Sequence, residues 1–155
     1  MKKAVSFICC IAGVIMYSCK KDKAVPETSR GVDINAFYEC NTAQQLDTAE
    51  MANKLLGKWK LILSACGECN DPGWYEPVKT VFVTFTSPNE FSVEENSTVI
   101  SSGHWNLCMI DTNKWVLCSS SSLNYIAGYI LFCDNRVLFY NSYIDGIDNL
   151  FEKLN

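Results

Sequence analysis

The strongest constraint on the fold is a series of short apolar runs that begins after Gly57 and is divided by turn residues. Val81, Val83 and Phe85 alternate with polar or less buried neighbours, which is the period-two pattern of a strand with one buried face. Eight runs predict strands, at residues 58–65, 79–86, 91–93, 103–110, 115–119, 124–133, 137–142 and 147–153. The connections between them are too short for the crossover helices that parallel strands require.

We therefore predict an all-β fold, an eight-stranded antiparallel up-and-down barrel over residues 57–155, because a closed barrel leaves no sheet edge exposed. One short helix is expected before it, over residues 41–56, which are rich in helix formers and contain neither proline nor glycine. Asn41 or Thr42 is the expected cap of this helix, and Gly57 ends it.

The N-terminus has the pattern of an export signal. Lys2 and Lys3 precede an uncharged run over residues 4–17, which is shorter than the ~20 residues of a membrane span. The run ends at Ser18 and Cys19, directly before a charged stretch, and this arrangement resembles a bacterial lipoprotein signal. The resemblance implies removal of residues 1–18, a lipid on Cys19 and sorting to the outer membrane. The alternative is a plain secretory signal with an incidental cysteine.

The segment 19–40 is predicted to be the lipidated tether. Its first part, residues 20–32, contains Pro26, Gly31 and several charges but little apolar surface. Such a composition cannot bury enough apolar area to fold by itself, so we expect this part to be a disordered stalk.

The chain has nine cysteines, which fall into three groups. Cys9 and Cys10 belong to the expected signal, and Cys19 is the expected lipid anchor. In an oxidising compartment the other six suggest up to three disulfides of open connectivity. These disulfide candidates are Cys40, Cys66, Cys69, Cys108, Cys118 and Cys133. As a hypothesis, Cys108 pairs with Cys118, because both flank a predicted hairpin turn.

Short motifs at both ends of the predicted barrel resemble a known family. Gly57 and Trp59 open the first strand after the helix, as in the Gly-x-Trp signature of lipocalins. A second run of this kind contains Gly103, Trp105 and Leu107. With the signal and the strand pattern, the chain resembles the lipocalin-like domain lipoproteins of Gram-negative bacteria.

The last predicted strand ends in Phe151 and Lys153, an aromatic-x-basic pattern that matches the same family. The resemblance implies that Trp59 plugs the closed end of the barrel and that Lys153 packs over it. Such a cation–π contact is worth ~0.5–2 kcal/mol. The chain departs from the family in two ways, because its domain is shorter than most and lysine stands where arginine is usual.

The side chains on the parity of Trp59 are expected to face the barrel interior, where they form either a packed core or a ligand cavity. They are Leu61, Leu63, Val81, Val83, Phe85, Phe91, Val93, Trp105, Leu107 and Met109. Trp74 and Tyr75 follow a turn and are expected at the rim of the open end, where they gate a cavity, contact a partner or cover the core.

No motif in the sequence demands an enzyme, and we predict no catalytic residue, cofactor or metal site. Cys66-x-x-Cys69 resembles a thioredoxin-type redox pair, but the turn residues that follow it do not begin the helix that such chemistry needs. A structural disulfide is therefore favoured over redox activity and over metal binding. His104, which alternates with Trp105, is expected to face solvent, and the adjacent Glu94 and Glu95 to point to opposite faces.

The charge balance also limits the possible functions. Thirteen Lys and Arg residues against 17 Asp and Glu give a net charge of −4, which argues against a nucleic-acid-binding surface. We expect an outer-membrane-anchored, non-catalytic protein that binds a small hydrophobic ligand. The alternative is an envelope protein-interaction or inhibitor module with a filled barrel core, and a thiol oxidoreductase is a distant third.

If Cys19 carries the lipid, the protein made in a bacterial host will incorporate labelled palmitate and fractionate with membranes. We expect Cys19→Ala to abolish the label and to release the protein into the soluble fraction, while Cys10→Ala retains the wild-type label. Undiminished labelling of the Cys19→Ala protein contradicts the assignment.

Overall fold

A computed structural model of the chain describes residues 32–66, 73–87 and 89–155. The expected signal peptide, Cys19 and Cys69 lie outside these residues. Within the described ranges, every helix is too short or too polar to cross a membrane.

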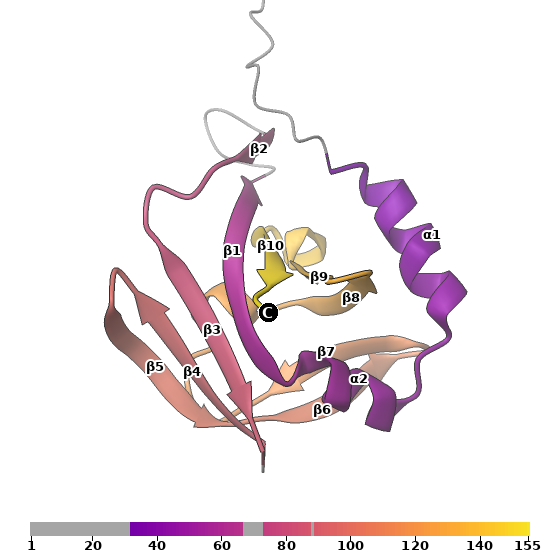
Figure 1. Ribbon diagram of the computed structural model, residues 1–155. Coiled ribbons are helices and arrows are strands. Elements are labelled where there is room, and N and C mark those ends of the chain that lie inside the picture. Colours follow the sequence, from indigo (N-terminus) through magenta and orange to yellow (C-terminus); the bar gives the residue numbers. More distant parts are fainter. Residues whose placement is uncertain (1–31, 67–72, 88) are drawn as a thin grey trace, which may run out of the picture.

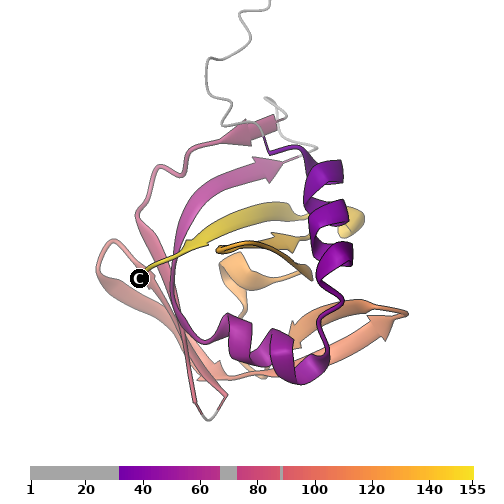
Figure 2. The same ribbon diagram turned by 45° about the vertical axis from the view of Figure 1, so that its right-hand side comes forward.

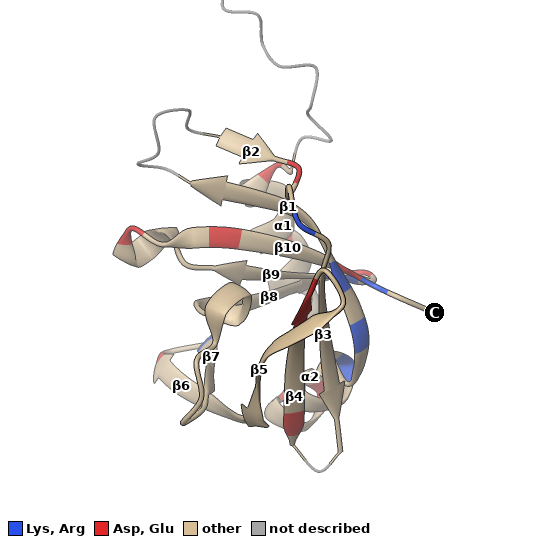
Figure 3. Cartoon of the chain, turned by 90° about the vertical axis from the view of Figure 1, so that its left-hand side faces the viewer, with Lys and Arg blue, Asp and Glu red and all other residues tan. Residues whose placement is uncertain are grey.

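One antiparallel sheet contains most of the described chain, and it curls into a half-barrel (Figure 1). Its strands are β1 (Gly57–Cys66), β2 (Gly73–Tyr75), β3 (Val81–Thr86), β4 (Glu90–Glu95), β5 (Thr98–His104), β6 (Asn106–Asp111), β7 (Lys114–Cys118), β8 (Tyr129–Cys133), β9 (Arg136–Tyr140) and β10 (Ile147–Lys153). Their order is β5-β4-β3-β1-β10-β9-β8-β7-β6, and β2 pairs with β1. Figure 3 shows the curl, with β3, β4 and β5 running across the direction of β1, β10, β9 and β8.

The predicted barrel-like antiparallel fold is confirmed, but the predicted number of eight strands is wrong. The described residues form ten strands, partly because the strand expected at 103–110 is divided at Trp105. The Trp105 backbone N–H donates to the Asn89 carbonyl at 2.8 Å, and its indole N–H donates to the Glu90 carbonyl at 3.1 Å. These bonds bury Trp105 between β5, which pairs with β4, and β6, which pairs with β7.

A second difference concerns residues 124–133, which were expected to form one strand. Asn124–Ile126 instead forms the 3₁₀ turn η1, and β8 begins only at Tyr129. The turn buries Ile126 in the core while Tyr125 reaches Glu95 on β4. A second 3₁₀ turn, η2 (Ser142–Ile144), joins β9 to β10.

The single helix expected over residues 41–56 is also wrong, because the chain forms two helices. These are α1 (Ile34–Gln44) and α2 (Thr48–Leu55). Gln45 adopts a left-handed conformation with φ of 47°, which ends α1. Asp47 then begins α2 with a capping box, in which its carboxylate accepts from the Glu50 N–H and its own N–H donates to the Glu50 carboxylate.

The helix α1 begins inside the segment 19–40 that was expected to be a tether. Asp33 caps it by accepting hydrogen bonds from the N–H groups of Asn35 and Ala36. Figure 2 shows α1 along one side of the half-barrel and α2 across one end. Phe37 of α1 is buried against the outer face of the sheet, so this helix is part of the folded domain.

A β-bulge in β1 divides the apolar residues between two layers. Leu61 is paired with Phe151 and Leu63 with Leu150, so Ile62 is an extra residue in β1. Leu61 and Phe151 lie in the interior core, whereas Leu63 and Leu150 are buried in a second cluster under α1. The prediction that Leu63 faces the interior is therefore wrong, because the bulge reverses the parity beyond it.

Most of the other predicted interior residues lie in the core. The buried interior includes Trp59, Leu61, Val81, Val83, Phe85, Phe91, Val93, Trp105, Phe132 and Phe151. Leu107 is only partly buried against this core. Met109 is 59% exposed, so its expected interior position is wrong. It lies on β6, which is the last strand of the sheet and pairs only with β7 among the described strands.

The contact predicted between Trp59 and Lys153 is present. These residues pair across β1 and β10, and the Lys153 Nζ lies 5.1 Å from the centre of the Trp59 ring. Both also donate to the end of α2, Lys153 to the Lys54 carbonyl at 2.9 Å and the Trp59 indole to the Leu55 carbonyl at 2.6 Å. Gly57 has φ of +117°, and a Cβ there would lie 3.1 Å from Cε of Lys153. We call this end of the sheet the closed end.

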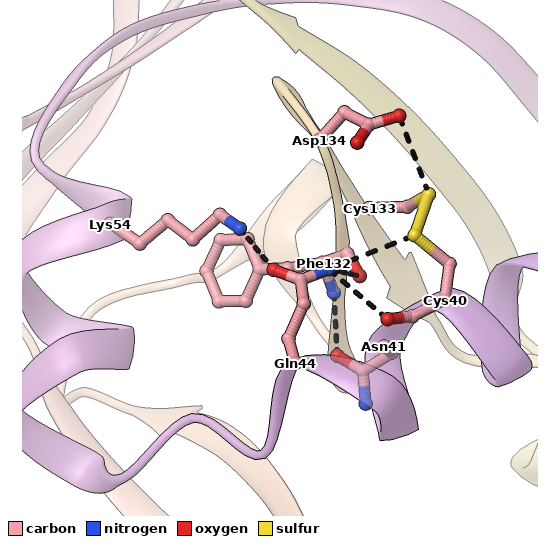
Figure 4. The surroundings of a disulfide bond; sticks show 7 residues. All are labelled: Cys40, Asn41, Gln44, Lys54, Phe132, Cys133 and Asp134. Atoms are coloured by element: carbon pink, nitrogen blue, oxygen red, sulfur yellow. Dashed lines mark hydrogen bonds between the residues drawn. A yellow bond between two sulfur atoms is a disulfide. The ribbon is translucent and has the colours of Figure 1, made fainter.

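Side chains of α1 replace a strand along part of β8. β7 meets β8 through the single pair Val116 and Tyr129. Farther along β8, Asn41 Oδ1 accepts from the Phe132 N–H at 2.8 Å, and Gln44 Nε2 donates to the Phe132 carbonyl at 2.9 Å (Figure 4). The backbone of Phe132 is thus satisfied on this side without a neighbouring strand.

Two disulfides connect described residues. Cys108 and Cys118 bridge β6 and β7, as predicted from their positions around the hairpin turn. Cys40 and Cys133 join α1 to β8, close to the Asn41 and Gln44 contacts (Figure 4). Cys66 is also disulfide-bonded. These bonds fit the expectation that the cysteines are structural.

The two described disulfides are expected to differ in their contribution to stability. Cys40 and Cys133 are 93 residues apart, whereas Cys108 and Cys118 are 10 apart, so the first bond restricts the unfolded chain more. In the loop-entropy model, we expect Cys40→Ser with Cys133→Ser to cost about 4.5 kcal/mol and Cys108→Ser with Cys118→Ser about 2.5 kcal/mol. Urea unfolding of both double variants measures this, and equal losses contradict the prediction.

Candidate ligand-binding cavity

A cavity of about 680 Å³ lies at the other end of β1 from Trp59, and we call it the open-end cavity. Apolar side chains from four strands form much of its wall: Leu61 of β1, Val81 of β3, Ile100 of β5 and Ile147 of β10. The interior of the half-barrel is therefore packed around Trp59 and open at the opposite end of β1.

The bulge in β1 turns a polar pair toward this cavity. Beyond it, Ser64 is opposite Asn149 of β10, and both residues line the cavity while being only 4% exposed. The Ser64 hydroxyl donates to Asn149 Oδ1 at 2.8 Å. The Asn149 amide nitrogen lies 3.4 Å from the Ile147 carbonyl, to which it donates. Burial of this pair is tolerated because each side chain has a partner.

Asn141, at the junction of β9 and η2, has a different environment. Its Oδ1 is the one buried side-chain oxygen or nitrogen in the described part of the chain that lacks a hydrogen-bond partner. Asn141 also lines the open-end cavity. A buried acceptor without a donor costs about 1–3 kcal/mol, so this position requires an explanation.

The backbone around Asn141 is fixed by the buried carboxylate of Asp148. Asp148 Oδ1 accepts from the N–H groups of Asn141 at 2.7 Å and Ser142 at 2.8 Å. Its Oδ2 accepts from the Ser142 hydroxyl at 2.7 Å. The Asn141 carbonyl in turn accepts from the N–H of Gly146 at 3.1 Å. These bonds close the turn η2 and hold Asn141 against the cavity.

A charged group lies on the opposite wall of the cavity. Glu95 Oε1 accepts from Lys79 Nζ at 2.6 Å, and Glu95 Oε2 accepts from the Tyr125 hydroxyl at 2.6 Å. The hydrogen bond from Lys79 lowers the pKa of Glu95, and the bond from Tyr125 lowers it further. Burial and the bond to Glu95 raise the pKa of Tyr125 to about 12. The phenol therefore remains a hydrogen-bond donor at neutral pH.

Only one of the two predicted rim aromatics reaches the cavity. In β2, Tyr75 is opposite Ser64 and lines the cavity, whereas Trp74 is opposite Ala65. Successive strand residues face opposite sides, so Trp74 instead packs against the cluster under α1 that contains Phe37. The prediction of a rim position is wrong for Trp74.

Few of the residues that line the cavity are predicted from the sequence. Of the expected cavity-or-core set, Leu61 lines it together with Val81, while Val83, Phe85, Phe91 and Trp105 belong to the packed core. The missed residues include the polar Ser64, Glu95, Tyr125, Asn141 and Asn149 and the apolar Val78, Ile100 and Ile147. The available signal was a polar residue within an apolar run, as at Ser64, but the bulge that orients it has no sequence mark.

The remaining sequence candidates are separate from the cavity chemistry. His104 is exposed, as predicted. Glu94 and Glu95 point to opposite faces, as predicted, because Glu94 approaches Lys58 at 3.8 Å on the outside.

One group of possible metal ligands occurs among the described residues, formed by Cys40, Cys133 and Asp134. Both of its sulfur atoms are joined in a disulfide, so in this state the group offers no thiolate to a metal ion.

Alkaline pH is expected to weaken the fold through two tyrosines. Burial, with neighbouring Tyr140, Asp148 and Tyr129, raises the pKa of Tyr38 to about 12, as for Tyr125. A phenol whose pKa rises on folding contributes stability that is complete below pH 10.0 and is lost as the pH rises through about 12. We expect the free energy of unfolding to fall across this pH range. Tyrosinate absorbance of the native protein should appear at a higher pH than that of the unfolded chain.

The variant Tyr125→Phe tests the assignment to this side chain. The chain has seven tyrosines. The part of the tyrosinate absorbance that appears only near pH 12 should decrease by the contribution of one tyrosine. An unchanged late component in Tyr125→Phe means that Tyr125 is not shielded in the way described.

Comparison of the chain with protein-family models, with curated proteins and with solved structures finds no match. The geometry and chemistry of the open-end cavity are therefore the basis for assigning a function.

Proposed function

We propose that the protein is a non-catalytic binding protein that holds one small hydrophobic molecule in the open-end cavity. The observation that carries this proposal is a cavity of about 680 Å³, in which eight of the 14 lining residues are apolar or aromatic and six are polar or charged. Small-molecule sites in proteins have volumes of about 300–1,000 Å³ and combine apolar and aromatic side chains with placed polar groups.

The exposed residues at the rim of the cavity are apolar, which favours a hydrophobic ligand. Tyr75, Val78, Ile100 and Ile147 line the cavity and are all exposed, with Val78 fully so. Exposed apolar residues that gather around one opening are typical of a binding site. A hydrophobic molecule entering here covers part of this surface as well as the interior wall.

The lipocalin-like interpretation is part of the proposal. It is supported by the curled antiparallel sheet and by the position of Lys153 over the Trp59 ring at the closed end. We propose further that Cys19 is lipidated and that the domain is anchored to the outer membrane. A membrane-anchored position gives the cavity access to molecules that are poorly soluble in water.

The alternative of a protein-interaction or inhibitor module has less support. It assumed a filled barrel and a loop aromatic, Trp74, as the contact residue. The interior is packed near Trp59 but open near Ser64, and Trp74 packs against the cluster under α1.

Binding of pyrene, an apolar fluorescent molecule without hydrogen-bonding groups, tests the proposal. We expect saturable binding with the emission of an apolar environment. Ile147→Trp should weaken it by about tenfold or more, equal to about 1.4 kcal/mol, because the larger ring occupies the cavity. The matched control is Met109→Trp, which adds the same ring at an exposed position of β6 outside the cavity lining.

Native mass spectrometry of protein purified from its host is the complementary measurement, and we expect a co-purifying small molecule. Equal pyrene affinity in the Ile147→Trp and Met109→Trp proteins would place the probe elsewhere. Absence of pyrene binding to the wild-type protein would falsify the proposal.

A further inference from the structure

We infer that the open end of the half-barrel docks on the surface of a zwitterionic lipid bilayer through a group of exposed apolar residues, with the opening of the cavity toward the lipid. The inference rests on the proposed function, because it assumes the lipid on Cys19. It names the surface that the open end contacts, whereas the proposed function concerns binding in the cavity and anchoring of the chain.

Exposed apolar side chains gather at the open end. Among the described residues, ten large apolar side chains are exposed, and five of these lie around the opening of the cavity. Four of the five line the cavity, and Ile144 lies on η2 between the lining residues Asn141 and Ile147. We call the five residues the apolar rim: Tyr75, Val78, Ile100, Ile144 and Ile147. Such a group around one opening is typical of a surface that contacts a partner or a membrane.

The apolar rim is built from segments that are far apart in the sequence. Tyr75 ends β2, Ile100 is on β5, and Ile147 begins β10. Val78 lies between β2 and β3 and is fully exposed. A peptide strand or helix binds along one edge or groove, whereas a bilayer interface receives apolar side chains over a broad area. The spread of the rim over several walls of the cavity therefore favours a lipid surface.

The chain enters the folded domain at the open end. Val32, the first described residue, packs against the cluster under α1, as Trp74 of β2 also does. Figures 1 and 2 both show α1 beginning beside β2. The segment 20–31 separates Cys19 from Val32, and a chain of this length spans at most about 40 Å. The closed end is farther away by the length of β1, which is roughly 30 Å. An anchor on Cys19 therefore holds the open end nearest to the membrane.

The charges near the opening indicate which lipid surface fits. Lys79 and Glu95 pair with each other at 2.6 Å. Glu76 and Asp145 are each next to a rim residue in the sequence, and both are exposed. Neither takes part in an ion pair within the described part of the chain. Two unpaired carboxylates beside the rim are repelled by an anionic surface, whereas zwitterionic headgroups carry no net charge.

Quenching of tryptophan emission by brominated lipid tests the docking. The lipidated protein is placed in phosphatidylcholine vesicles whose acyl chains carry bromine near the headgroup. Ile144→Trp and Val78→Trp add a reporter at two rim positions on different segments. Met109→Trp is the matched control, because Met109 is 59% exposed against 62% for Ile144 and lies on β6 outside the cavity lining.

The measured quantity is the emission that each variant adds to that of the four native tryptophans. Apolar side chains at a membrane interface reach about 5–10 Å into the boundary between headgroups and acyl chains. We therefore expect the bromines to remove about half or more of the added emission of both rim variants. The added emission of Met109→Trp should remain.

Vesicles that also contain anionic phosphatidylglycerol test the charge argument. We expect the quenching of Ile144→Trp to decrease in these vesicles. Adding Glu76→Gln with Asp145→Asn should restore it, because the repelled carboxylates are then absent. The control pair is Asp134→Asn with Glu152→Gln, which removes two exposed carboxylates near the closed end and should not restore it.

The outcomes distinguish this inference from the proposed function. Unquenched rim variants in protein that is bound to the vesicles overturn the docking and leave the anchor and the pyrene site intact. Equal quenching of Met109→Trp and the rim variants also overturns it. Rim emission that depends on protein concentration instead of brominated lipid identifies a second copy of the chain as the occupant and overturns the lipid assignment. Failure of the protein to associate with vesicles overturns the proposed anchoring and the inference together.

Discussion

The closed end of the sheet depends on the bonds that Trp59 and Lys153 donate to the last carbonyls of α2. Carbonyls at a helix C-terminus have no partner within the helix and carry partial negative charge, so a lysine ammonium is a favourable donor to them. Burial lowers the pKa of Lys153, and the nearby Lys54 lowers it further, which is the cost of this position. Because Trp59 and Lys153 also pair across β1 and β10, the same contact sets the register of the two central strands.

That register and the bulge at Ile62 together determine what the interior contains. Before the bulge, β1 directs Leu61 into the core, and after it Leu63 lies under α1 while Ser64 faces the cavity. A regular strand would place Leu63 inside and Ser64 outside. One additional residue therefore places Ser64 at the cavity and adds Leu63 to the apolar cluster on which α1 packs.

The sequence predicted those features that depend on local pattern. Period-two alternation indicated the sheet, and the hairpin positions of Cys108 and Cys118 indicated their bond. Features that depend on tertiary context were missed. The break between α1 and α2 occurs at Gln45, a residue with no particular preference for a left-handed conformation. The cavity polar groups depend on the Ile62 bulge, and Asn141 depends on a turn held by Asp148.

The contacts of Asn41 and Gln44 with Phe132 also affect how the protein avoids self-association. An unpaired strand backbone is a template on which another chain can add a strand, and such addition leads to aggregates or exchanged dimers. Two side-chain amides of α1 occupy this template on β8, and the Cys40–Cys133 bond keeps them there. The helix α1 therefore protects the backbone of β8 from pairing with another chain. Removal of α1 by proteolysis would expose this backbone and promote self-association.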